Sequence, residues 1–446
     1  NKSSYWINTW EPATSFMRSN KLIEKLILTC ALMFTGCQGN VLQTPEVRLP
    51  GMADTPAVRL NFRYEADVPP PGGEMATGID ERHAGVQADF DTNRPQEILD
   101  RTIVSPDKQR IVAVYHRLTD VPAEYRLDMY SADGQLLKKI TSDTMAVHFP
   151  DTIVWSPDSS NLAFVAMVRA LQPSSILPTG GTPTPTPGAT PDESAANDLT
   201  AEPVDEVPII TNPTPPAPTG ILTFRTEQIY ICNTDGGDLK PLTQNEGMIY
   251  FYFAWSPDST ALAALAATWQ EWRFEQLQSE QRGEIFTPSG RPRLVEKNGR
   301  VRLLDDRPTK VRPVWSPDSA KTAVAIDKEI RIFDAIGDAP TQASIPLRNP
   351  LLISSKKYDD DLKAKEGIVE ANANSNANAT ANADVGTLPD ENTLVSFNPI
   401  ISLEWTEDKM LYLQTGYVKE LKDAANSARS YLRWHRLIFS PQAVAY

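Results

Sequence analysis

The sequence has few of the residues on which several functional classes depend. Its 446 residues include only three cysteines and four scattered histidines, so we expect neither a disulfide framework nor a His-built metal site. Basic residues are outnumbered 43 to 57, and the formal charge of −14 argues against nucleic acid as a partner. Gly-x-Ser-x-Gly, His-Glu-x-x-His, Cys-x-x-Cys and phosphate-loop motifs are absent. We therefore expect no catalytic residues, no metal and no cofactor.

Proline, in contrast, is abundant, and much of it lies in one stretch. Residues 171–219 are rich in Pro and Thr and contain no Lys, Arg or aromatic residue. A second biased stretch, about 356–392, is polar and contains an Asn/Ala-rich run. Neither has enough apolar surface to offset the entropy lost on ordering, so we predict two long disordered insertions. An O-glycosylated stalk or a docking site for a proline-reading domain is the alternative for the first one.

Residues 17–36 have the layout of an export signal. Basic residues precede a short apolar core, 26–34, which is well below the ~20 residues that span a bilayer. The segment resembles a bacterial lipoprotein signal, which implies cleavage between Gly36 and Cys37 and acylation of the Cys37 thiol. Residues 1–36 would then be absent from the mature chain, which would be exported and anchored to the extracytoplasmic side of a membrane. A plain secretory signal or a buried apolar helix remains the alternative.

A Trp-Ser-Pro-Asp pattern recurs along the rest of the chain, each time followed by a short apolar run. Ser-Pro-Asp suits a tight turn, because Pro fixes φ and Ser or Asp can bond the local backbone. The apolar runs suit buried strands. Degraded copies occur at 104–107 and 405–408. The full copies consist of Trp155, Ser156, Pro157 and Asp158, of Trp255, Ser256, Pro257 and Asp258, and of Trp315, Ser316, Pro317 and Asp318.

A second hairpin signal follows most of these units, which gives four strands per repeat. The period is about 50 residues once the two insertions are set aside, and this is typical of a β-propeller. The pattern resembles the TolB-type, WD-like propeller repeat. We therefore predict an all-β propeller of five to six four-stranded blades over 99–446. Residues 37–98 would form a tether, and an alternating segment at 58–64 could close the ring by pairing with the last blade.

Each recurring feature has a structural and a functional interpretation. The motif Asp residues are expected to serve their own turns, although they could line a channel and bind a cation. The motif Trp residues are expected to pack between blades, although a ring of them could stack on carbohydrate. The acidic run 359–361 is expected in a solvated loop, with calcium binding as the alternative. Residues 269–281 could form a short helical insertion, and Cys232 is expected to be a buried hydrophobe.

These features favour a non-enzymatic binding lipoprotein. TolB-type proteins act as partners in envelope complexes, so the resemblance implies another envelope protein as the partner. The alternative is an extracytoplasmic hydrolase or lyase, or a carbohydrate-binding protein, with its site in the central funnel of the propeller.

Overall fold

The structure is a computed structural model that describes residues 51–72, 82–121, 123–168, 225–337, 339–365 and 387–442. The predicted signal 17–36, with Gly36 and Cys37, lies outside the described residues, as does the insertion 171–219. Within the described ranges no helix has the length and apolar character needed to cross a membrane.

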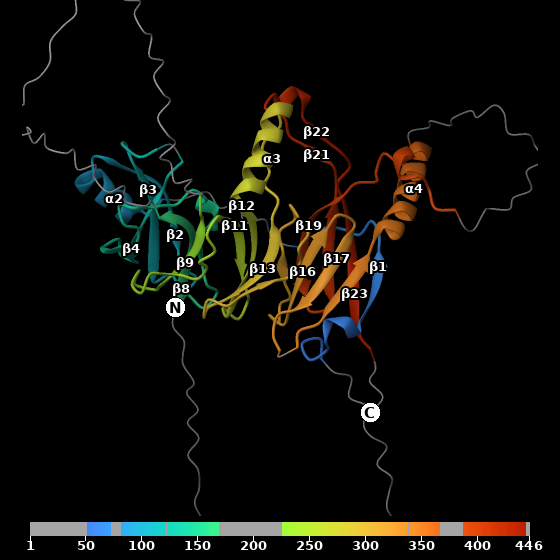
Figure 1. Cartoon of the computed structure of the whole chain (residues 1–446), viewed down its shortest axis with the longest axis horizontal. Coiled ribbons are helices and arrows are strands. Elements are labelled where there is room, and N and C mark those ends of the chain that lie inside the picture. Colours follow the sequence, from blue (N-terminus) through green and yellow to red (C-terminus); the bar gives the residue numbers. More distant parts are fainter. Residues whose placement is uncertain are drawn as a thin grey trace, which may run out of the picture. The chain divides into compact units, whose positions relative to one another are not determined.

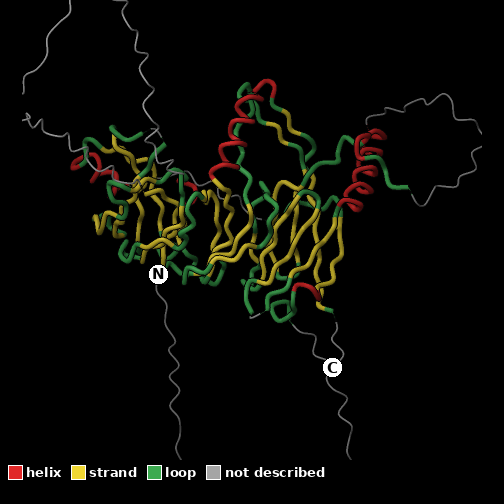
Figure 2. The backbone as a smooth tube through the Cα atoms, in the orientation of Figure 1, coloured by secondary structure: helices red, strands yellow, loops and turns green. Residues whose placement is uncertain are grey.

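Apart from one two-stranded hairpin, the described strands form five antiparallel sheets of four or, in the second sheet, five strands, which we call blades 1 to 5 in chain order (Figures 1 and 2). This is the four-stranded repeat of a β-propeller. Blade 1 consists of β2 (Glu97–Val104), β3 (Arg110–Arg117), β4 (Arg126–Ser131) and β5 (Leu136–Lys139). Blade 2 consists of β6 (Met145–Ala146), β7 (Val154–Trp155), β8 (Asn161–Val168), β9 (Gln228–Asn233) and β10 (Lys240–Pro241). Blade 3 consists of β11 (Met248–Trp255), β12 (Ala261–Thr268), β13 (Arg291–Glu296) and β14 (Val301–Leu303).

Blades 4 and 5 complete the set. Blade 4 consists of β15 (Val314–Trp315), β16 (Lys321–Ile326), β17 (Glu329–Asp334) and β18 (Gln342–Pro346). Blade 5 consists of β19 (Ile400–Glu407), β20 (Met410–Thr415), β23 (Arg433–Pro441) and β1 (Leu60–Glu65). The alternating segment near 58–64 thus contributes β1, whose Phe62 pairs with Phe439 in β23. The last blade is therefore built from both ends of the described chain.

Each pair of consecutive blades shares a buried apolar cluster. Alternate residues of each central strand face the preceding and the following blade, as the period-2 geometry of strands requires. On β8, Leu162 packs toward blade 1, whereas Ala163 packs toward blade 3. Similar clusters join blades 3 and 4 and blades 4 and 5. Cys232 is fully buried in the cluster of blades 1 and 2, and burial raises the pKa of its thiol to about 12.

Two helices correct the sequence-based boundaries. The stretch 66–98, expected as polar tether, contains helix α2 (Ala84–Asn93), whose buried residues are Val86 and Phe90. Helix α4 (Arg348–Lys365) extends into the expected insertion 356–392. The acidic run 359–361 therefore lies in this helix and not in a solvated loop. Asp359 is buried there and accepts a hydrogen bond from the backbone N–H of Val395 at 2.9 Å.

The third helix, α3 (Trp269–Arg282), is the insertion between β12 and β13. A capping box between Thr268 and Glu271 begins it, and Gly283, at φ 66°, ends it. The residues after it meet the small hairpin of β21 (Val418–Lys419) and β22 (Ala428–Arg429), because Ile285 N–H donates to Glu420 O at 2.9 Å. Insertions of blades 3 and 5 are thus hydrogen-bonded to each other.

Helices α3 and α4 and hairpin β21–β22 share one edge of the sheets. In an antiparallel blade the Ser-Pro-Asp turn joins the first two strands at one edge. The next connection, and the passage to the following blade, therefore lie at the opposite edge. We call this opposite edge the insertion edge. The short one-turn helices are η1 (Ala57–Arg59), η2 (Pro150–Thr152), η3 (Glu391–Thr393) and η4 (Ala424–Asn426).

Candidate functional site

A cavity of about 960 Å³ opens at the insertion edge between α4 and the end of β1. It combines apolar walls with convergent polar groups, the usual character of a binding site. Its lining includes Tyr64 from β1, Asp67 from the loop that follows β1, and Ser354 and Tyr358 from α4. The site is therefore assembled from segments almost 300 residues apart in sequence, as the Tyr64–Ser354 contact illustrates.

His435 lies next to this lining and is fully buried. Its Nδ1 accepts hydrogen bonds from Tyr64 Oη at 2.9 Å and from the backbone N–H of Asp67 at 3.4 Å. Because a backbone N–H can only donate, the ring proton lies on Nε2, which donates to Thr415 Oγ1 at 3.0 Å. Burial, assisted by the charge of Arg433, lowers the pKa of His435 to about 4. The imidazole is therefore neutral at pH 7.

Arg433 fixes the geometry of the same region. It is 3% exposed, and its Nε and Nη2 donate to the two carboxylate oxygens of Asp67 at 2.7 and 3.0 Å. Its Nη1 donates to Ser355 Oγ at 2.7 Å, and its guanidinium carbon lies 4.7 Å from the centre of the Tyr358 ring. A buried charge that is paired and hydrogen-bonded in this way is stable. Arg433 thus connects β23, the end of β1 and α4.

Several polar groups of the lining, such as Tyr64, Asp67 and Ser354, are therefore hydrogen-bonded to their neighbours, and Asp361 lines the same cavity. Burial also raises the pKa of Tyr64 to about 12, so its hydroxyl stays protonated. The walls supply Pro350, Ile353 and Leu362, and Ile353 is 58% exposed. Lys357 also lines the opening. This combination suits the binding of an apolar side chain of a partner, with an acidic group beside it.

The residues singled out from the sequence lie in turns at the opposite edge. In each full motif copy the Ser hydroxyl donates to the Asp carboxylate two residues later, at 2.5 to 2.6 Å. The same carboxylate oxygen accepts from the backbone N–H two residues further on, as Asp318 does from Ala320 at 3.0 Å. The motif Pro residues, Pro157, Pro257 and Pro317, occupy the turn between these groups. Each Asp therefore serves its own turn.

The motif also joins neighbouring blades. The indole N–H of Trp255 donates to Val154 O at 3.2 Å in the preceding blade, and that of Trp315 donates to Ala254 O at 3.0 Å. Trp155 makes the same type of bond to Ile103 O at 3.4 Å. In the opposite direction, each motif Asp donates its backbone N–H to a Ser hydroxyl of the next blade. Asp158 donates to Ser259 at 3.1 Å, and Asp258 donates to Ser319 at 2.9 Å. Trp405 of blade 5 departs from this pattern and bonds to Asp408 O in its own turn at 3.4 Å.

Two motif Asp residues come together at a hollow of about 810 Å³ that Trp315 and Lys297 also line. Burial opposes ionisation of Asp158, but hydrogen bonds from Ser156 and from residue 160 outweigh it and hold the pKa of Asp158 at about 2. Such a carboxylate suits a turn more than a catalytic acid. In the part of the chain that the structure describes, no group of three or more His, Cys, Asp or Glu side chains could hold a metal ion.

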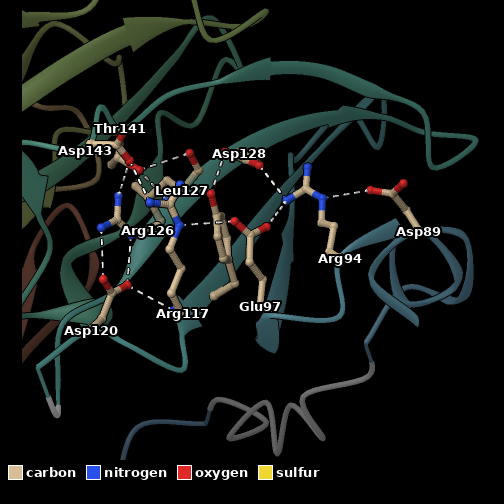
Figure 3. A network of polar contacts seen from close by, with 11 residues as sticks. Asp89, Arg94, Glu97, Arg117, Asp120, Arg126, Leu127, Asp128, Thr141 and Asp143 are labelled. Carbon is tan, nitrogen blue, oxygen red and sulfur yellow. Dashed lines mark hydrogen bonds and ion pairs between the residues drawn. The ribbon is translucent and has the colours of Figure 1, made fainter. Parts of the chain in front are cut away.

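A network of charged side chains attaches α2 to blade 1 (Figure 3). Arg94, just after the helix, lies 2.7 Å from Asp128 Oδ2 and 3.2 Å from Glu97 Oε2. It also lies 3.2 Å from Asp89 Oδ2, and its guanidinium carbon is 4.5 Å from the centre of the Phe90 ring. Because Asp128 is fully buried, we assign this network a structural role in holding the helix on the sheet.

Sequence reasoning missed the residues around the cavity. Arg433 and His435 occupy alternate positions of β23, and both face inward. The usable signal was their phase, since they share the face of the apolar Leu437 and Phe439. A charged residue that shares a strand face with buried apolar residues indicates a buried polar cluster. Its partners could not be identified from the sequence, because they lie far away along the chain, in or beside β1 and α4.

Comparisons with known proteins complete the description. No protein-family model and no curated protein matches the chain. Among similar solved structures is prolyl oligopeptidase B from Galerina marginata, with 9% identity over 85% of this chain and 45% of that chain and a TM-score of 0.36. A manganese complex of oligogalacturonate lyase has 10% identity over 77% and 66%, with a TM-score of 0.34. A protein from Agrobacterium tumefaciens described as TolB has 11% identity over 56% and 69%, with a TM-score of 0.25.

The chain spans less than half of that peptidase, and 31% of it in a second of its structures. The assignment as a β-propeller rests on the five sheets themselves.

Proposed function

We propose that the protein is an exported, lipid-anchored and non-enzymatic propeller that binds another envelope protein at its insertion edge. The observation that carries the proposal is the cavity under α4, whose walls include the exposed Ile353, while Tyr64 and Asp67 of its lining are held by the buried His435 and Arg433. An apolar opening whose Tyr64 and Asp67 are engaged with buried side chains supports docking of a partner.

Cross-linking in native membranes tests the docking site. Ile353→Glu places a charge on the cavity wall, and we expect it to reduce recovery of the cross-linked partner by at least about tenfold. Ile336→Glu is the matched control, because Ile336 is 64% exposed and follows β17 at the opposite edge. Both variants should melt like the wild type. Equal partner recovery from the two variants would contradict the proposal.

The lipid anchor has a separate test. Metabolic labelling with a clickable fatty acid should mark the wild-type chain and leave Cys37→Ser unlabelled. Two or three acyl chains hold a protein stably on a bilayer, whereas one holds it only marginally. Persistent labelling of Cys37→Ser would refute the anchor without affecting the docking site.

The rival function, a hydrolase or lyase, has the hollow beside Asp158 and Asp258 as its most acidic location. Under that hypothesis, Asp258→Asn would abolish turnover and leave the melting temperature unchanged. Under the proposed function it lowers the melting temperature and leaves partner recovery from the folded fraction intact.

A further inference from the structure

A second cavity, of about 340 Å³, lies beside α3 and shares no lining residue with the cavity under α4. Aromatic rings from four separate segments meet in its lining, around Trp272 of α3. The centre of the Trp272 ring lies 5.6 Å from that of Phe149, 5.4 Å from that of Phe251 and 5.0 Å from that of Phe286. We call it the aromatic cavity.

A β-bulge in β11 places two consecutive aromatic residues in this lining. The register of β11 against β12 shifts between Tyr250 and Tyr252, so that Phe251 is the extra residue. In a regular strand Phe251 and Tyr252 would point to opposite faces, whereas here both line the cavity. Gly290 makes room for one of them, because a Cβ there would lie 2.7 Å from the ring of Phe251.

The bulge belongs to the repeat, but its aromatic filling belongs to blade 3. Strands β2 and β19 have bulges at the equivalent position before the motif, where Asp100 and Ile401 are the extra residues. The residues that follow them are Arg101 and Ser402. Bulges that redirect side chains are common beside binding sites. Among the described blades, these three bulges hold an aromatic pair only in β11.

Two cationic side chains of the lining have no acidic partner. Lys310 and Arg312 are both exposed, and among the described residues neither side chain forms an ion pair or a hydrogen bond. The guanidinium carbon of Arg312 lies 4.9 Å from the centre of the Tyr252 ring. The nearby Arg291, in contrast, has its Nη1 2.7 Å from Glu271 Oε1. In a chain with more acidic than basic residues, two unpaired cations beside a cavity indicate an anionic ligand.

The hydroxyl of Tyr252 is a further polar group that a ligand can use. The residue is half-buried, and its hydroxyl has no hydrogen-bond partner among the described residues. Burial raises the pKa of Tyr252, although the charge of Arg312 opposes this, so the hydroxyl stays protonated at pH 7. It can therefore donate a hydrogen bond to an anion that binds Arg312.

We propose that the aromatic cavity binds a small aromatic carboxylate, with its ring against Phe251 and Phe286 and its carboxylate on Arg312. The planar guanidinium suits a carboxylate, because its parallel N–H groups can bind both oxygens. The rings of the lining suit an aromatic ligand, because aromatic pairs form favourable edge-to-face and offset contacts.

The size and polarity of the cavity narrow the class of ligand. Its volume lies at the lower end of the range of about 300–1,000 Å³ for small-molecule sites, which suits one or two rings. A sugar acid fits less well, because each of its hydroxyls needs a hydrogen-bond partner. Besides the two cations, the lining offers few polar side chains, such as Tyr252 and Thr287.

Ligand-observed NMR titration of the full chain with benzoate tests the proposal, with Cys37→Ser present throughout so that no acyl chain offers a second apolar site. We expect benzoate to bind with a dissociation constant below about 10 mM. Benzamide has the same ring without the charge, and we expect it to bind at least about tenfold more weakly.

Variants locate the site. Arg312→Gln should weaken benzoate binding at least about tenfold, whereas Phe286→Ala should weaken benzoate and benzamide alike. Arg300→Gln is the matched control for charge, because Arg300 is 71% exposed in the turn between β13 and β14, at the opposite edge of blade 3. It should bind benzoate like the wild type. Thermal melts should show that all three variants are folded.

Several results would overturn the proposal. One is a dissociation constant for benzoate above about 10 mM, and another is benzamide binding as tight as that of benzoate. Arg312→Gln binding like the wild type, or Arg300→Gln as weak as Arg312→Gln, would place any bound benzoate elsewhere. Glucuronate binding more tightly than benzoate would assign the cavity to a sugar acid instead.

Discussion

The two terminal blades finish their outer faces in different ways. On blade 1, Leu99, Tyr115 and Tyr130 are at most 2% exposed, because Val86 and Phe90 of α2 pack on them. On blade 5 the equivalent outer face carries partly exposed Tyr, Trp and Arg side chains and no helix of its own. A stack of sheets must shield its last face from water. Among the described residues, helix α2 shields the outer face of blade 1, whereas the outer face of blade 5 carries partly exposed side chains.

The largest effect should separate these two ends directly. Phe90→Ala removes a 3% exposed ring between α2 and blade 1 and should lower the free energy of unfolding by about 3–5 kcal/mol. Trp434→Ala truncates a larger side chain, but one that is only partly buried on the outer face of blade 5, and should cost the monomer less than Phe90→Ala does. Urea titrations of dilute protein measure both. Similar losses would mean that the outer face of blade 5, which points away from blade 4, is covered within a single chain.

Acid should act on blade 5 through His435. Its folded-state pKa of about 4 lies below the ~6.5 of an unfolded chain, so only the unfolded chain takes up this proton as the pH falls between these values. The stability contributed by neutral His435 is complete above pH 6.5 and is lost progressively toward pH 4, by about 3 kcal/mol. His435→Gln removes this titration and should flatten the dependence of the melting temperature on pH over that window. A variant with the wild-type slope would rule out His435 as the cause.

The blades themselves could be predicted from the sequence because their signal is local and repeated. Each Trp-Ser-Pro-Asp copy specifies a turn between two strands within ten residues, and tandem recurrence excludes chance. The helices at the margins could not be placed in this way. Helix α2 buries only Val86 and Phe90, so its pattern is too sparse to be distinguished from a polar tether. In α4 the acidic run 359–361 has the composition of a loop. Its place in a helix could not be predicted, because Asp359 is buried through a hydrogen bond from the backbone N–H of Val395, which is distant in sequence.

The cavity could not be predicted because its residues gain meaning only from long-range pairing. Arg433 needs Asp67 from the start of the described chain, and His435 needs Tyr64. The motif residues, in contrast, could be recognised from the sequence as turn residues. Nothing in a single copy indicates that the backbone N–H of its Asp donates to a Ser hydroxyl of the next blade. Contacts between blades therefore require the fold, whereas contacts within a turn do not.

A smaller effect on stability should distinguish the junction between blades 2 and 3 from the junction between blades 4 and 5. Ser259→Ala removes the hydroxyl that accepts from the backbone N–H of Asp158 across a junction, and should cost about 0.5–1.5 kcal/mol. Lys409 occupies the same place after the degraded motif of blade 5, and Lys409→Ala should change stability by less than about 0.5 kcal/mol. Thermal melts of the two variants measure the difference. A costly Lys409→Ala would indicate a junction at blade 5 that follows the internal pattern.

The smallest effect on stability should come from Glu404, and its sign is informative. Partial burial raises the pKa of this carboxyl above that of an unfolded chain, so its ionised form weakens the fold slightly. Glu404→Gln should therefore leave the melting temperature of dilute monomer unchanged or slightly higher, within about 0.5 kcal/mol. A clear loss of stability in Glu404→Gln, measured by thermal melts at pH 7, would show instead that the ionised carboxyl contributes to the fold.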